Sequence, residues 1–145
     1  MRIAVDTGIL VRANVKATGP ARELLPRIAS GGHTLLLSPF VLEQIRQVLA
    51  YPRIQKLYAL TNMEIESFVQ SLENAAELVN PVVRVPVVLA DPTDDPVLYT
   101  AVAGRTDVLC ALDRHFYHPA VLAFCRDRGI EIMSDVELLK KLRDT

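Results

Sequence analysis

The segment Arg2-Ile3-Ala4-Val5-Asp6-Thr7-Gly8 is a short apolar run that ends on a carboxylate. A run this brief and apolar is typical of a strand that is buried on both faces of a parallel sheet. Asp6 is then expected at the carboxyl end of that strand. Because ligands of open α/β sheets bind outside the carboxyl ends of the strands, this position suits chemistry better than core packing.

Strand-like and helix-like segments alternate along the rest of the chain. Ser38-Pro39 and Asp95-Pro96 each have the form of an N-cap followed by a first-turn proline, and Thr61 and Ser134 each precede a glutamate by three positions, as in a capping box. Pro52 is expected to bend or stop a helix. The predicted helices cover 21–29, 39–49, 62–79, 95–104, 119–128 and a closing segment after Ser134. The predicted strands cover 3–5, 33–37, 108–112 and 130–133, with an extended edge segment at 80–90 around Pro81 and Pro86.

This alternation predicts parallel βαβ units with right-handed crossovers, and therefore an α/β fold, a three-layer α/β/α sandwich around a central parallel sheet. At 145 residues, 50% hydrophobic and 23% charged, the chain is expected to form a single domain over residues 1–145. We also expect a cytoplasmic protein without a signal peptide or membrane anchor, because no apolar run approaches the ~18 to 20 residues needed to span a bilayer. Cys110 and Cys125 lack metal-ligand spacing and are interpreted as buried hydrophobic residues.

Three carboxylates are expected at one rim of this sheet. Asp6 ends the first strand, Asp113 ends a later one, and Asp95 begins the helix that leads into that later strand. Each also has an ordinary structural role, Asp95 as an N-cap and the other two as residues that end strands. Clustered carboxylates repel one another, and a hard divalent cation such as Mg²⁺ relieves the repulsion while binding substrate phosphate. The pattern therefore predicts a metal site for phosphodiester chemistry. Because the net charge is −1, binding of any nucleic acid would need a local basic patch.

The sequence resembles the PIN domain family, and within it the toxin components of toxin–antitoxin pairs. The order and spacing of four segments carry the resemblance over nearly the whole chain: Val5-Asp6-Thr7, residues 36–43, residues 91–98, and Val108-Leu109 ahead of Asp113. It implies a Mg²⁺- or Mn²⁺-dependent endoribonuclease that cleaves single-stranded RNA and has an antitoxin protein as partner. The catalytic and metal-binding residues that it implies are Asp6, Glu43, Asp95 and Asp113.

Glu43 follows from the resemblance alone, because it lies opposite the apolar stripe of helix 39–49, as a solvated glutamate would. Asp91 and Asp94 stay open as further ligands or supporting groups. The candidate phosphate contacts flank the motifs, and are Arg12, Lys16, Arg46 and Arg114. Apolar residues outside the core stripes of helices 39–50 and 62–79 predict a protein contact there, either a homo-oligomer or the antitoxin; they include Phe40, Tyr51, Leu57 and Tyr58.

Two segments depart from the family pattern. Gly8 stands where the family usually has asparagine or serine, and Ala111-Leu112-Asp113-Arg114-His115 stands where threonine-glycine-aspartate-x-aspartate is common. An alternative function is therefore a weakened or silent PIN-like module that binds RNA or a protein. A phosphotransfer domain of the haloacid-dehalogenase type is disfavoured by Gly8, one of the response-regulator type by Thr7, and dinucleotide binding by the lack of a glycine-rich loop after the first strand.

Overall fold

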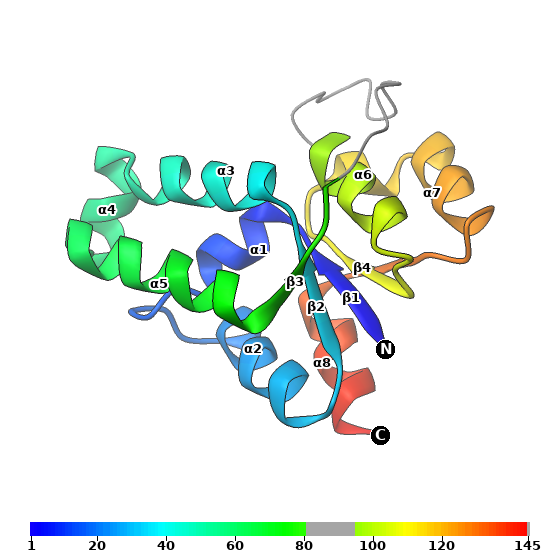
Figure 1. Cartoon of the computed structure of the whole chain (residues 1–145), viewed down its shortest axis with the longest axis horizontal. Coiled ribbons are helices and arrows are strands. Elements are labelled where there is room, and N and C mark those ends of the chain that lie inside the picture. The colour runs from blue at the N-terminus through cyan, green and yellow to red at the C-terminus, as the bar shows by residue number, and fades with distance from the viewer. Residues whose placement is uncertain (81–94, 145) are drawn as a thin grey trace.

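The computed structural model describes residues 1–80 and 95–144, and the side chain of Asp95 lies outside the described part. A five-stranded parallel sheet runs through these residues in the order β3-β2-β1-β4-β5 (Figure 1). The strands are β1 Arg2–Val5, β2 Thr34–Leu37, β3 Ala76–Leu78, β4 Val108–Cys110 and β5 Glu131–Met133. The helices are α1 Thr7–Arg12, α2 Pro20–Ser30, α3 Pro39–Leu49, α4 Pro52–Tyr58, α5 Asn62–Ala75, α6 Asp95–Ala103, the 3-10 helix η2 Arg114–Tyr117, α7 Pro119–Arg126 and α8 Asp135–Arg143.

Helices cover both faces of the sheet and confirm the predicted three-layer α/β/α sandwich. Helices α6 and α7 lie on one face, and α2, α5 and α8 lie on the other (Figure 1). Central strand β1 pairs with β2 through Ile3 opposite Leu35 and with β4 through Ile3 opposite Val108. Because Ile3 and Ala4 point to opposite faces of the sheet and are both buried, this strand has the two-sided burial that its apolar sequence predicts.

Capping residues set the starts of several helices where the sequence predicts them. Ser38 Oγ accepts a hydrogen bond from Val41 N at the start of α3, and both partners of the capping box are formed at Thr61 and at Ser134. Pro52 does end the preceding helix, but it also occupies the first turn of a new one, α4. Cys110 and Cys125 are buried free thiols, as expected.

The ends of one helix and one strand differ from the prediction. Helix α5 ends at Ala75, and Ala76–Leu78 forms the edge strand β3, although the apolar stripe continues to Val79. The chain leaves the helix at this point because hydrogen bonds to β2, where Ala76 lies opposite Leu35, replace those of the helix. Strand β4 ends at Cys110, so Asp113 does not end a strand. The predicted extended segment at 80–90 falls almost wholly outside the described residues.

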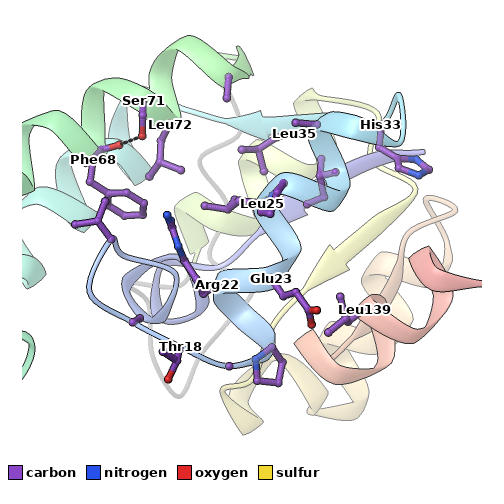
Figure 2. Close-up of a pocket in the computed structure, with 18 of the residues that line it drawn as sticks. Thr18, Arg22, Glu23, Leu25, His33, Leu35, Phe68, Ser71, Leu72 and Leu139 are labelled. Atoms are coloured by element: carbon purple, nitrogen blue, oxygen red, sulfur yellow. Dashed lines mark hydrogen bonds between the residues drawn. The ribbon is translucent and has the colours of Figure 1, made fainter.

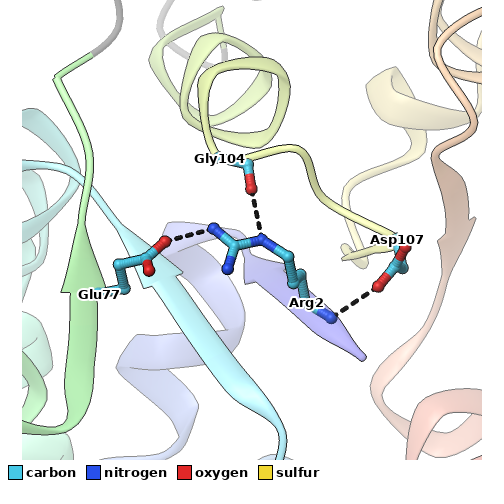
Figure 3. Close-up of polar contacts among 4 residues, drawn as sticks. All are labelled: Arg2, Glu77, Gly104 and Asp107. Carbon is cyan, nitrogen blue, oxygen red and sulfur yellow. Dashed lines mark hydrogen bonds and ion pairs between the residues drawn. The ribbon is translucent and has the colours of Figure 1, made fainter.

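A polar cluster at the amino end of β1 ties several elements together (Figure 3). Arg2 Nε donates to Gly104 O at 2.8 Å after α6, and the Arg2 guanidinium pairs with Glu77 of β3. The backbone N of Arg2 donates to Asp107 Oδ2 at 2.8 Å. Gly104 leaves room for Leu36 here, since a Cβ at this position would lie 2.9 Å from a Leu36 methyl group. This cluster fixes the end of the sheet opposite Asp6. In the part of the chain that the structure describes, no helix is long and apolar enough to span a membrane.

Candidate active site at the carboxyl edge of the sheet

Asp6 directly follows β1 and is held by backbone groups on both sides. Its Oδ1 accepts from Ile9 N at 2.8 Å, which makes it the N-cap of α1, and its Oδ2 accepts from Leu112 N at 3.3 Å. Its own N donates to Cys110 O of β4 at 2.9 Å. The carboxyl group therefore bridges the ends of β1 and β4. These two neighbouring strands lead into connections that run in opposite directions across the sheet, the position where open α/β sheets bind ligands.

Burial makes the Asp6 carboxyl unusual. The residue is only 5% exposed, and the loss of solvation raises its pKa from 3.8 to about 6. The two backbone hydrogen bonds act against this rise, the negative charge of Asp113 adds to it, and Arg12 lowers it. Asp6 and Asp113 are therefore close enough to interact electrostatically, as the prediction of a shared rim requires.

Asp113 lies in the loop after β4 and begins the 3-10 helix η2. Ala111 N still donates to Met133 O of β5 at 2.9 Å, after which the chain turns and lets Leu112 N reach Asp6. Asp113 Oδ1 accepts from His115 N at 3.0 Å and lies 3.1 Å from His115 Nδ1. Asp113 reaches the rim as an exposed loop residue and not, as predicted, by ending a strand.

Asp95 begins α6, so its backbone lies where the sequence predicts the start of this helix. Its side chain lies outside the described residues, as do Asp91 and Asp94. The helix is tied to α3 by two buried hydroxyl groups, Thr100 Oγ1 and Ser38 Oγ, which are 2.8 Å apart. Thr100 Oγ1 also donates to Pro96 O at 2.7 Å, one residue after Asp95.

Glu43 lies on the exposed side of α3, as the helical periodicity indicates. Its Oε2 accepts from Arg46 Nη1 at 2.7 Å, and Arg46 Nε donates to Glu66 Oε1 of α5 at 2.9 Å. These bonds, first that to Glu66 and then that to Glu43, raise the pKa of Arg46. Arg46 is therefore engaged by two carboxylates, whereas Arg12 and Arg114 are exposed near Asp6 and Asp113.

Two polar side chains beside the predicted acids were given no part in the site by the sequence analysis. Thr7 directly follows Asp6, and its Oγ1 donates to Oε1 of Gln44, which directly follows Glu43, at 2.5 Å. Gly8 contributes no side chain, although a Cβ there would lie at an ordinary 3.7 Å from Asp6 Oδ1. The pairing joins residues 37 positions apart, so no local pattern could have indicated it.

An open groove of about 1290 Å³ lies away from these acids, alongside α2. Apolar side chains of α2, β2, α5 and α8 line it, and Arg22 points into it (Figure 2). Arg22 Nη1 donates to Ala13 O at 2.9 Å. Asp6, Glu43 and Asp113 are absent from its lining, so despite its size we assign it no part in the chemistry.

The fold is a parallel α/β sandwich, and Asp6 and Asp113 lie at the carboxyl edge of its sheet. A family model described as PIN domain matches residues 2–115. The chain belongs to the PIN domain family, whose members are in general nucleases that use divalent metals. No curated protein matches the chain.

The donor chemistry of the site fits a hard cation. Asp6 and Asp113 offer carboxylate oxygens, the ligands that Mg²⁺ and Mn²⁺ prefer, and the repulsion between them is the kind that a bound cation relieves. Within residues 1–80 and 95–144, with the Asp95 side chain left aside, no three Asp, Glu, His or Cys side chains are grouped closely enough to hold a metal. Of the other predicted ligands, Glu43 is paired with Arg46, and the side chain of Asp95 lies outside the described residues.

Proposed function

We propose that this protein is a Mg²⁺- or Mn²⁺-dependent endoribonuclease that cleaves single-stranded RNA. The observation that carries the proposal is the buried Asp6 carboxyl, whose raised pKa reflects burial and the nearby charge of Asp113, at the carboxyl edge of a PIN domain sheet. Keeping an ionised carboxylate in so buried a position costs folding free energy, and such a cost is typical of functional sites.

In this proposal Asp6 and Asp113 hold the metal, and Glu43 and Asp95 complete its ligand set. A divalent ion bound there supplies a water of lowered pKa and offsets phosphate charge. The backbone groups of Ile9 and Leu112 keep the Asp6 carboxyl in a fixed orientation. The products would carry a 5′-phosphate and a 3′-hydroxyl, since water adds to phosphorus as the bond to the 3′ oxygen breaks.

The substrate contacts proposed for this site are basic side chains beside the acids. Arg12 and Arg114 are exposed and are suited to phosphate, which carries no sequence information. Arg46 was also predicted to bind phosphate, but it forms ion pairs with Glu43 and Glu66 and is therefore not free for RNA. We propose that a metal ion must compete with Arg46 for Glu43, and that RNA must compete with Glu43 and Glu66 for Arg46. Glu43 can bind a cation only after its ion pair with Arg46 breaks.

We further propose that the protein is the toxin of a toxin–antitoxin pair and forms a homo-oligomer. The sequence resemblance supports the first, and exposed apolar side chains on α3 and α4 support the second, with Phe40 58% and Leu57 71% exposed. The rival function is a silent module that binds RNA or protein. The ion pair that occupies Glu43 favours this rival, as does the absence of a side chain at Gly8.

The deciding experiment compares Asp6→Asn with a matched Asp127→Asn control. Asp127 is an exposed aspartate that ends α7, so both variants exchange one carboxylate for an amide. We expect wild-type protein and Asp127→Asn to cleave mixed single-stranded RNA in Mn²⁺ or Mg²⁺ and to stop when chelator is added. Asp6→Asn should lose at least ~100-fold in rate, because the site loses a charged ligand.

Two outcomes contradict the proposal. Cleavage that survives both the chelator and Asp6→Asn shows a different mechanism or a contaminating nuclease. A wild-type protein that neither cleaves RNA nor gains thermal stability from Mn²⁺ is the silent module, because a ligand that binds only the folded state must stabilise it.

A further inference from the structure

The hydrogen bond between Thr7 and Gln44 joins the two elements that carry the first two predicted ligands. Thr7 is the first residue of α1 and Gln44 lies in the second turn of α3. The 2.5 Å separation of Thr7 Oγ1 and Gln44 Oε1 is at the short end of the range for an O–H···O bond. Both residues are half-buried, so water competes less for this bond than on an open surface.

The rest of the contact between these helices has little directional character. The buried residues of both helices are apolar side chains; those of α1 are Ile9, Leu10 and Val11, and those of α3 are Val41, Leu42, Ile45 and Leu49. Apolar packing brings the helices together and sets their overall crossing, but it constrains the position of a single polar side chain less closely than a hydrogen bond does, because the hydrophobic effect is non-directional. The Thr7–Gln44 bond supplies direction at the level of Asp6 and Glu43.

The turn after β1 has no other side chain suited to this task. Asp6 uses both carboxyl oxygens on backbone groups, Gly8 has no side chain, and Ile9 is apolar and buried. Thr7 is therefore the residue of this turn whose polar side chain reaches another helix. A hydroxyl group must be the donor in this bond because Oε1 of an amide only accepts.

We propose that Thr7 and Gln44 form a positioning pair, which holds the Glu43 turn of α3 in place relative to Asp6 and thereby sets the affinity for the divalent cation. This inference rests on the function proposed above. The pair acts through Asp6 and Glu43 and touches neither metal nor RNA. If the Thr7–Gln44 bond is lost, Asp6 and Glu43 are still present but no longer correctly placed. Loss of such supporting hydrogen bonds typically weakens metal binding ~10 to 100-fold.

The test is a double-mutant cycle of Thr7→Val and Gln44→Met, with metal affinity as the readout. Valine keeps the shape of threonine without its hydroxyl, and methionine keeps the length of glutamine without its acceptor. Mn²⁺ is titrated against thermal unfolding of each variant, with metal-free unfolding measured in parallel. We expect each single variant to weaken Mn²⁺ binding about 10-fold, and the double variant to weaken it by less than the product of the two single effects, since both changes remove the Thr7–Gln44 bond.

Two controls separate positioning from a loss of stability. Thr7→Ser keeps the hydroxyl and should restore wild-type Mn²⁺ affinity. Thr61→Val removes the hydroxyl group that caps α5, so it should lower metal-free stability and leave Mn²⁺ affinity unchanged. Gln44→Met alone provides the same comparison with wild-type protein if Thr7→Val does not fold.

The outcomes distinguish this inference from the proposed function. If wild-type protein binds Mn²⁺ and Asp6→Asn does not, while Thr7→Val or Gln44→Met binds as wild type does, the site stands and the positioning pair is overturned. The inference is also overturned if the double variant weakens Mn²⁺ binding by the product of the two single effects, because the residues would then act separately. Wild-type protein without any Mn²⁺ response overturns the proposed function, and the positioning role falls with it.

Discussion

At the scale of single residues, the burial of Asp6 has consequences for stability as well as for chemistry. Its pKa of about 6 in the folded protein is above the value of 3.8 expected in the unfolded chain. Between these values the folded state binds more protons than the unfolded state, so the free energy of unfolding falls as pH rises. At 1.36 kcal/mol per pKa unit, ionisation of Asp6 costs the metal-free fold roughly 3 kcal/mol above pH 6, and this cost is absent below pH 4.

The metal-free Asp6→Asn variant should therefore be more stable than wild type at pH 8. We expect a gain of about 1 to 2 kcal/mol, smaller than the full cost because asparagine offers only one oxygen to the NH groups of Ile9 and Leu112. The gain should vanish at pH 4, where Asp6 is protonated. Urea unfolding in chelator at both pH values measures it, and Mn²⁺ at pH 8 should reverse the order by stabilising only the wild type. A variant less stable than wild type at pH 8 contradicts this account of Asp6.

Sequence alone indicates Asp6 because its position after a buried strand is a local property. Glu43 has no such signature, since a glutamate on the exposed side of an amphipathic helix is ordinary, and it enters only through family resemblance. The bonds from Leu112 N to Asp6 and from Thr7 to Gln44 arise when distant segments meet in the fold. Single-residue patterns therefore predict the candidate ligands but not the groups that hold these ligands in place.

At the scale of elements, helix starts are the features that the sequence predicts best. A cap depends on residues at most three positions apart, a proline directly after Ser38 and a glutamate three positions after Thr61 and Ser134, so these caps can be identified without knowledge of the fold. Helix α1 has no counterpart among the predicted elements because six residues are too few to show helical periodicity. The ends of α5 and β4 were misplaced because the next partner strand decides them, and an apolar stripe does not reveal it.

The caps of α3 and α5 should differ in how much stability they contribute. Ser38 is fully buried and its hydroxyl meets both Val41 N and Thr100 Oγ1, whereas the Thr61 cap is exposed. Thr61→Ala should cost about 1 kcal/mol, as is usual for an N-cap. Ser38→Ala should cost about 2 to 3 kcal/mol, because it also removes a buried hydrogen-bond partner of Thr100. Urea unfolding compares the two variants, and equal losses would show that the α3–α6 bond contributes nothing.

At the scale of the whole molecule, the strand order places the site. Alternation of strands and helices predicts a parallel sheet but leaves the order of its strands open. The observed order puts β1 and β4 side by side at its centre, which brings Asp6 to the loop that carries Asp113. It also puts the Arg2 cluster at the opposite end of the same strands (Figure 3). The candidate site and the Arg2 cluster thus lie at opposite ends of β1.

The exposed apolar residues between the start of α3 and the start of α5 divide into two places on the molecule. Tyr51, Leu57 and Met63 lie on or next to α4, which joins α3 to α5 at one end of the molecule (Figure 1). We call these three residues the α4 surface. Phe40 lies at the other end of α3, and Tyr58, which was also predicted to be exposed, is half-buried against the core. A contact between two copies of the chain is therefore expected at the α4 surface.

Leu57→Lys should weaken that contact without unfolding the protein. The residue is 71% exposed and α4 has no buried residue, so the substitution removes apolar area only from the surface. Val136→Lys is the matched control, because Val136 is 59% exposed on α8. In sedimentation velocity the wild type and the control should sediment as dimers, and Leu57→Lys should shift towards monomer, with the dimer dissociation constant raised at least ~10-fold by placing a charge in an apolar contact. A monomeric wild type refutes self-association, and a dimer unaffected by Leu57→Lys moves the contact to another face of the molecule.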